Sequence, residues 1–270
     1  MKHRFITFLT DFGLGDDFVG TCHGVIKRIA PDCEIIDITH GIPPQQVLQG
    51  ALVLRNTIEY MPAGVHLAVI DPGVGSSRRP VVLEDGDGRL YVGPDNGLLI
   101  PAAERAGIAA VHEIANPAYA LEPVSRTFHG RDLFAPAAAH LALGVSANDL
   151  GPPLALDVLA RLDLPEPHVD RSGLHATVLY VDQFGNMQLN LTREHLDSAD
   201  VVPGTRLELD VGGARYLATA TRTFADARPG EIVLYEDSYR NIAVAINRGS
   251  AAQMFAVGAG QPVELRTASL

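Results

Sequence analysis

The sequence has 270 residues, of which 47% are hydrophobic and 20% are charged, a length that suits one large domain or two modest ones. A formal net charge of −11 argues against binding to nucleic acid, and no apolar run approaches the roughly 20 residues that a membrane helix needs. The N-terminus passes directly into a strand-like segment without the features of a signal peptide, so we expect a cytoplasmic protein with no membrane partner.

Strand and helix patterns alternate through the first half of the chain. Residues 4–10 have the pattern of a buried strand, and apolar side chains then recur at helical spacing over residues 18–29. A short strand is predicted at residues 34–38, a helix over residues 47–58 and another buried strand at residues 65–70. Repeated β-α-β units of this kind favour a mostly parallel sheet with helices on both faces.

The pattern changes in the proline-rich segment 152–167, which is typical of a linker. From Leu174 onward the sequence predicts only strands and turns, and short strands at regular spacing indicate a small barrel or sandwich. We therefore predict an α/β protein in two parts. An N-terminal α/β domain with a mostly parallel central sheet spans residues 1–165, and a smaller, barrel-like all-β domain spans residues 172–270.

Polar turns follow three of the strand-like runs in the first half and place Asp11, Asp71 and Asp95 where the strands end. Ligands of open parallel sheets bind beyond the carboxyl ends of the strands. Each carboxylate alone is better explained as a turn residue or a helix cap than as a ligand-binding group. His129 directly precedes a helical pattern and, taken alone, is better explained as an exposed side chain than as a catalytic one. The residues alone indicate a two-domain α/β enzyme with an acidic cleft at the strand ends.

The aspartates and histidines of this region are of the kind that a metal-dependent hydrolase would use. Their spacing matches no dedicated metal motif, however, and the sequence has neither a phosphate-binding P-loop nor a complete dinucleotide-binding fingerprint. The two cysteines do not have the spacing of a metal site either. We expect no metal and no cofactor.

Motifs along nearly the whole chain carry a family resemblance: Leu9–Gly13, Gly15–Asp17, Asp37–His40, Val69–Gly75, Gly93–Leu99, Thr127–Asp132, Asp182–Asn186, Thr223–Asp226 and Asn247–Gly249. In this order they resemble the S-adenosyl-L-methionine (SAM) hydroxide adenosyltransferases, which are related to the fluorinating and chlorinating enzymes that use the same substrate. The resemblance implies hydrolysis of SAM to adenosine and methionine by in-line attack of an activated water at the ribose C5′ carbon.

The resemblance also implies roles for individual residues. Asp71, Arg78 and His129 match the set that handles the attacking water. Asp11 matches the carboxylate that binds both ribose hydroxyls, and Asn186 the amide that binds the adenine edge. Further positions match the aromatic residue against adenine and the surroundings of the methionine moiety: Phe224 for the former, and Asp16, Asp182, Ser238 and Tyr239 for the latter.

Two differences from the halogenating relatives favour hydrolysis. Those relatives carry Tyr where this chain has Asp71 and Ser where it has Gly130, so a charged set replaces their halide pocket. Relatives assemble as trimers in which the first domain of one subunit and the second domain of the next form each site, so the resemblance implies a homotrimer. A metal-dependent hydrolase that uses the Asp/His set and a non-catalytic module that binds SAM or adenosine are the alternatives.

Overall fold

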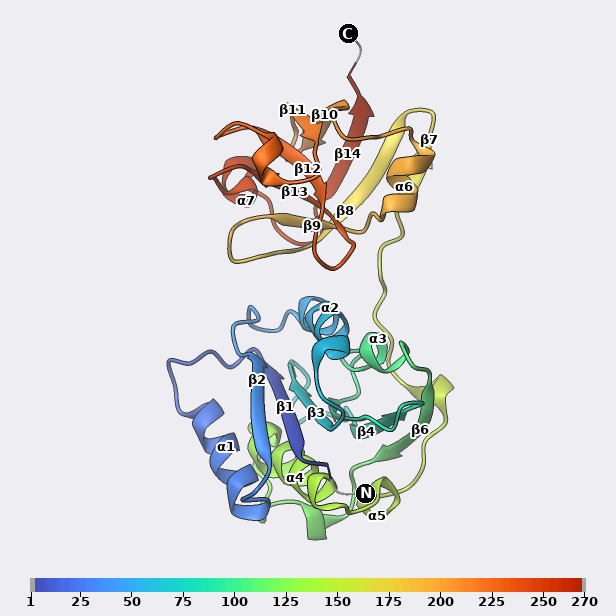
Figure 1. Ribbon diagram of the computed structural model, residues 1–270. Coiled ribbons are helices and arrows are strands. Elements are labelled where there is room, and N and C mark those ends of the chain that lie inside the picture. The colour runs from blue at the N-terminus through green and yellow to red at the C-terminus, as the bar shows by residue number, and fades with distance from the viewer. Residues whose placement is uncertain (1–2, 269–270) are drawn as a thin grey trace. The chain divides into compact units, whose positions relative to one another are not determined.

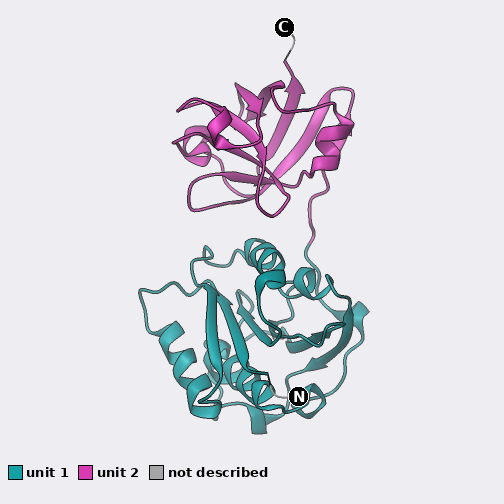
Figure 2. Cartoon of the chain, in the orientation of Figure 1, with its two compact units in different colours: residues 1–162 teal, residues 163–270 magenta. Residues whose placement is uncertain are grey.

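The structure is a computed structural model that describes residues 3–268 (Figure 1). The chain divides into two compact units, residues 1–162 and residues 163–270 (Figure 2). No helix of the described residues combines the length and the apolar character needed to cross a membrane.

Unit 1 contains a six-stranded sheet with the strand order β2-β1-β3-β5-β4-β6. The β1 strand pairs in parallel with β2 and β3, and β3 pairs in parallel with β5. The β4 strand lies antiparallel to both of its neighbours, β5 and β6, so the parallel arrangement is interrupted at one side. The strands are β1 (Phe5–Thr10), β2 (Glu34–Thr39), β3 (Val65–Val69), β4 (Pro80–Asp85), β5 (Leu90–Pro94) and β6 (Ile108–Glu113).

Helices cover both faces of this sheet, as the sequence predicts. Side chains of α1 and α4 share one apolar core with Ile6 and Phe8 of β1, while side chains of α2 and α3 share a second core with Leu9. Alternate residues of β1 therefore enter opposite cores, as the period of a strand requires. The helices of unit 1 are α1 (Phe18–Ile29), α2 (Val47–Thr57), α3 (Ile100–Ala103), α4 (Ala135–Leu143) and α5 (Ala147–Leu150), with 3₁₀ turns at Ile58–Tyr60, Pro117–Tyr119 and Leu156–Val158 and a π-helical turn at Gly130–Phe134.

The carboxyl ends of β1, β3 and β5 lie at one edge of the sheet because these strands are parallel neighbours. They end at Thr10, Val69 and Pro94, so the turns that carry Asp11, Asp71 and Asp95 begin at this edge. This edge is where open α/β sheets bind ligands.

Unit 2 is a closed β-barrel. Its strand order is β14-β10-β11-β12-β13-β9-β8-β7, and β14 also pairs with β8, which closes the ring and leaves β7 outside it. All pairings are antiparallel except β11 with β12. The strands are β7 (His168–Asp170), β8 (Gly173–Val181), β9 (Met187–Leu189), β10 (Arg206–Val211), β11 (Ala214–Ala220), β12 (Ile232–Glu236), β13 (Ile242–Ile246) and β14 (Pro262–Thr267).

The prediction of only strands and turns after Leu174 is wrong in detail, because unit 2 also contains short helices. These are α6 (Arg193–Ser198), α7 (Ala251–Phe255) and a 3₁₀ turn at Phe224–Asp226. All three are held by capping side chains; for example, the Ser250 hydroxyl accepts the backbone N–H of Gln253. Helices of five or six residues are too short for apolar periodicity to reveal.

Candidate active site

A pocket of about 330 Å³ opens at the carboxyl edge of the unit 1 sheet. The segments that follow β1, β2 and β3 and the start of the π-helical turn form its wall. The turn after β1 contributes Asp11, the turn after β3 contributes Asp71, and the segment before α4 contributes His129. The structure thus brings three sequence-predicted site residues to one cavity. The remaining lining residues are Phe12, Pro44, Gln45, Val69, Pro72, Val74, Thr127, Phe128 and Gly130.

Arg78 links Asp71 and His129 at this pocket. Its Nε donates to Asp71 Oδ1 at 3.0 Å, and its Nη2 forms an ion pair with Asp71 Oδ2. The same Nη2 lies 3.0 Å from His129 Nδ1. The Arg78 and Asp71 side chains are each only 7% exposed, and the guanidinium also lies over the Phe134 ring at 5.2 Å. A forked, largely buried pair of this kind fixes the orientation of the carboxylate.

The guanidinium decides the hydrogen-bonding state of His129. Arginine carries only donors, so Nδ1 of His129 must be the acceptor of this bond. A neutral imidazole then holds its proton on Nε2. Burial, and after it the charge of Arg78, lowers the pKa of His129 below its ordinary value of 6.5 and keeps the ring neutral.

The position of Arg78 also argues against a metal ion bound by Asp71 and His129 together. Asp71 Oδ2 and His129 Nδ1 both interact with the same arginine nitrogen. The guanidinium therefore occupies the place between them where an ion would need to lie, and a second cation there would be repelled.

Asp11 lies at the start of the turn after β1, and one of its carboxylate oxygens accepts a hydrogen bond. Its Oδ2 accepts the backbone N–H of Gln45 at 2.8 Å, and Gln45 adopts a left-handed backbone conformation with φ of 67°. The other oxygen is available to a ligand. Gln45 could not be predicted from the sequence, because neither its type nor its neighbours indicate a ligand contact.

Asp95 and Asp16 lie outside the pocket lining. Asp95 accepts two bonds from Arg79, at 3.1 and 2.8 Å, and the backbone N–H of Ala160 at 2.8 Å, so its turn anchors the segment that follows the 3₁₀ turn Leu156–Val158. Here the structural explanation of a strand-end aspartate is sufficient. Asp16 is exposed in the loop before α1.

A second pocket, of about 450 Å³, lies on unit 2. Asn186 and Phe224 line it together with Phe184, Ile246, Asn247, Arg248 and Gly249. Phe184 is 69% and Phe224 40% exposed, so two aromatic faces are open to a ligand or to another surface. The Asn247–Gly249 segment belongs to one of the motifs that carry the family resemblance, which assigns no individual role to its residues.

The polar residues around this pocket are organised by Asp182. Its Oδ1 accepts the backbone N–H groups of Phe184 and Asn186 at 2.8 and 2.9 Å, and its Oδ2 accepts from Asn186 Nδ2 at 2.8 Å. This leaves the amide oxygen of Asn186 as an acceptor. Ser238 and Tyr239 are exposed in the turn between β12 and β13, and neither lines the pocket.

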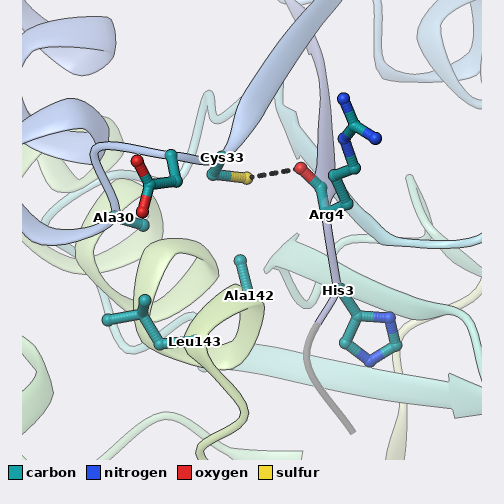
Figure 3. A pocket seen from close by; sticks show the side chains of 7 residues that line it. His3, Arg4, Ala30, Cys33, Ala142 and Leu143 are labelled. Atoms are coloured by element: carbon teal, nitrogen blue, oxygen red, sulfur yellow. Dashed lines mark hydrogen bonds between the residues drawn. The ribbon is translucent and has the colours of Figure 1, made fainter.

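Another hollow, of about 440 Å³, lies at the opposite, amino-terminal edge of the unit 1 sheet (Figure 3). It is formed by the start of β1, the loop from α1 to β2 and the end of α4. Cys33 Sγ donates to the carbonyl oxygen of Arg4 at 3.2 Å there, and the Ala142 and Leu143 side chains supply an apolar wall. His3, Arg4 and Asp32 also line this hollow, but no hydrogen bond or ion pair joins their described side chains to one another, and Cys33 is buried. The strand-end pocket, where Arg78 joins Asp71 and His129, is therefore favoured as the functional site.

Two family models match this chain. The model of the SAM hydroxide adenosyltransferase N-terminal domain matches residues 6–151, and that of the C-terminal domain matches residues 176–264. The chain belongs to the SAM hydroxide adenosyltransferase family. The resemblance found in the sequence motifs is thereby confirmed.

Relatives within and beside the SAM hydroxide adenosyltransferase family cover the chain almost completely. The (R)-S-adenosyl-L-methionine hydrolase of Salinispora arenicola is 46% identical over 261 residues, which are 96% of this chain and 97% of that protein. The fluorinase of Nocardia brasiliensis is 30% identical over 294 aligned residues, covering 98% and 97%. A crystal structure of an uncharacterized conserved protein from Thermotoga maritima superposes with a TM-score of 0.89 at 36% identity, covering 97% of this chain and all of that one.

Proposed function

We propose that this member of the SAM hydroxide adenosyltransferase family hydrolyses SAM at the ribose C5′ carbon and releases adenosine and methionine. The observation that carries the proposal is the Asp71–Arg78–His129 network in the wall of a pocket that also contains Asp11. The 46% identity to a SAM hydrolase over nearly the whole chain supports the same reaction.

The network suits the handling of a water molecule. With Nδ1 of His129 bound to Arg78, the Nε2–H group is a donor that can hold a water oxygen in place. The lone pairs of Asp71 that Arg78 leaves free can accept a water proton. A water attacking a carbon becomes strongly acidic as the new C–O bond forms, so a nearby carboxylate is a sufficient proton acceptor late in the step. Asp71 is therefore the proposed proton acceptor and His129 the orienting donor.

The leaving group explains why the reaction needs no metal. Attack at C5′ breaks the bond to a positively charged sulfur, and methionine departs as a neutral thioether. No negative charge develops on the leaving atom, so a Lewis acid has nothing to stabilise there. The rate comes from in-line alignment of water, carbon and sulfur and from a site that replaces bulk solvent.

Substrate recognition is proposed to use residues of both units. The free oxygen of Asp11 suits the ribose hydroxyls, and the amide oxygen of Asn186 suits an amino group on the adenine edge. The exposed face of Phe224 suits packing against adenine. Asp16, Asp182, Ser238 and Tyr239 stay predictions for the methionine moiety. Asp182 would act there through the turn it orders around Asn186.

Halogenation is disfavoured at this pocket. The Asp71 carboxylate would repel a halide at the position where the halogenating relatives carry Tyr. A Cβ atom at Gly130, where those relatives carry Ser, would lie 3.0 Å from Phe12 Cζ and would require the Phe12 ring to shift. The hydrolytic arrangement and the halide-binding one are thus sterically and electrostatically distinct.

The assembly is proposed to be a homotrimer, with unit 1 of one subunit and unit 2 of the next forming each complete site. Mixing tests this arrangement directly. Neither Asp71→Asn nor Asn186→Ala alone should turn over SAM appreciably. When the two proteins are dissociated, mixed in equal amounts and reassembled, about a quarter of the sites should combine two intact units and regain activity. No regain in a mixture proven by native mass spectrometry to contain both variants would contradict shared sites.

The reaction is tested by incubating the purified protein with SAM, with and without EDTA, and following products by liquid chromatography and mass spectrometry. Equal amounts of adenosine and methionine are expected, with a kcat at saturating SAM that EDTA does not change. Stoichiometric binding without product would instead identify a binding module. Activity lost in EDTA and restored by a divalent ion would identify a metal-dependent hydrolase. The cytoplasmic location stays a prediction.

A further inference from the structure

Two histidines and an aspartate converge beside the β1 turn, outside the pocket described above. His23 lies on α1, Asp37 on β2 and His40 directly after β2. Asp37 Oδ1 lies 2.9 Å from His23 Nε2 and 3.1 Å from His40 Nε2, and one ligand atom from each of the three residues lies within 4.8 Å of the others. None of these side chains is used in the proposed reaction.

His40 provides a second, independent observation at this cluster. Its side chain is only 3% exposed, and its Nε2, which faces the cluster, has no hydrogen-bond partner. The other ring nitrogen, Nδ1, lies 2.8 Å from the hydroxyl of Thr10, which is fully buried. When Nδ1–H donates to Thr10, Nε2 presents a lone pair toward the Asp37 carboxylate, and a cation bound to both groups would stabilise this tautomer.

We propose that His23, Asp37 and His40 bind a divalent transition-metal ion, for which Zn²⁺ is the best match. Two imidazole nitrogens and one carboxylate oxygen are ligands that Zn²⁺ accepts, with water completing the tetrahedron. In such a site neighbouring ligand atoms lie about 3.3 Å apart, close to both measured O–N separations. His23 and Asp37 are partly exposed, which leaves room for the water and for entry of the ion. The bond from His40 to Thr10 is the supporting contact that metal-bound histidines make.

The ion would connect three elements, one of which, the turn after β1, lines the substrate pocket. It would join α1 to the end of β2, and through His40 it would hold the β1 turn. The His40 carbonyl oxygen accepts the backbone N–H of Gly13 at 2.8 Å, and the Thr10 hydroxyl that contacts His40 also accepts the N–H of Phe12 at 3.1 Å. Asp11 lies between these contacts. The proposed site is therefore a clamp on the ribose-binding turn and does not supply the attacking water.

Calorimetry on the full-length protein tests the site. Protein stripped with a chelator and dialysed is titrated with ZnCl₂, and one strong site per chain is expected. His23→Gln and Asp37→Asn should each raise the Kd for Zn²⁺ at least about 10-fold. The matched control is His168→Gln, which removes an exposed histidine that lies 3.3 Å from Asp170 on unit 2 and should leave the Kd unchanged.

Two further measurements complete the test. Saturating Zn²⁺ should raise the Tm of the wild type by a few degrees and that of His23→Gln by much less. Circular dichroism verifies that each variant is folded before titration. No strong site in the wild type, or a site lost in His168→Gln and retained in His23→Gln, would overturn the proposal and leave an ordinary His–Asp ion pair. SAM turnover by the stripped protein is recorded separately, so that failure of the metal site and failure of the hydrolase proposal are distinguishable.

Discussion

Replacing Arg78 by Lys separates the charge of this residue from its geometry. Arg78 donates through Nε and Nη2 to Asp71 and through Nη2 to His129. Lysine keeps the positive charge but offers one compact ammonium group instead of the planar fork. We expect loss of at least one charge-assisted hydrogen bond in a largely buried pair, which corresponds to a destabilisation of about 2 kcal/mol.

The larger effect of Arg78→Lys should be on turnover. Displacing Asp71 or the His129 ring by about 1 Å spoils the alignment of the water and should lower kcat about 100-fold. Release of adenosine from SAM measures kcat, and denaturant titration measures stability. The matched control is Arg79→Lys. Its parent residue forms a similar fork with Asp95, 2.8 Å away, but Asp95 does not line the pocket, whereas Asp71 and His129, the partners of Arg78, do. The control should lose similar or less stability and retain kcat; equal loss of kcat in both variants, or none in Arg78→Lys, would refute the reasoning.

Three other substitutions test separate parts of the account. Asp11→Asn keeps an acceptor for the Gln45 backbone N–H but loses the charge. The Kd of a non-reacting SAM analogue, measured by calorimetry, should therefore rise about 10–100-fold. An unchanged Kd would show that Asp11 does not bind the ribose. His129→Asn keeps an acceptor for Arg78 but lacks Nε2–H, so kcat should fall about 100-fold. In the wild type, the acid limb of the profile of kcat against pH should have its midpoint below pH 6.5, because burial and Arg78 lower the pKa of His129. A midpoint above pH 6.5 would contradict the assigned state of the ring. Burial lowers the pKa of His66 to about 3, so the unfolded chain binds this proton more tightly than the folded one. The free energy of unfolding should therefore rise between about pH 3 and pH 6.5, by about 1.4 kcal/mol per pH unit. The rise of the calorimetric Tm with pH over this range should be smaller in His66→Asn.

The sequence is sufficient to predict the layout of the first unit where local patterns decide it. The apolar stripe from residue 18 to residue 29 becomes α1, and the buried runs that end near Thr10 and Val69 become β1 and β3. The position of β4, antiparallel between β5 and β6, could not be predicted in this way. Strand pairing depends on contacts between segments far apart in the chain, which periodicity does not contain.

The same distinction applies to the candidate site. Asp11, Asp71 and Asp95 follow strand-like runs in equivalent turns, yet Asp95 is engaged by Arg79 and by the backbone of Ala160. Only tertiary structure distinguishes a carboxylate that faces a cavity from one that anchors a neighbouring segment. The family resemblance assigns a role to Arg78, and the structure pairs Arg78 with Asp71 and its neighbour Arg79 with Asp95.

Gln45 and the cluster of His23, Asp37 and His40 show the limits of motif reading. Gln45 reaches Asp11 from 34 residues away in the chain through its backbone N–H group, so its side-chain type carries no signal. The histidines and the aspartate of the cluster are 14 and 3 residues apart, spacings that belong to no dedicated metal motif. They meet because α1 packs beside β2, which a one-dimensional pattern does not encode.

The central claim is that this protein delivers the oxygen of water to the C5′ carbon of SAM. Turnover in ¹⁸O-water, followed by mass spectrometry of both products, tests it most directly. One ¹⁸O atom in the 5′-hydroxyl of adenosine, and none in methionine, is the predicted result. Unlabelled adenosine, or label in methionine, would contradict the account.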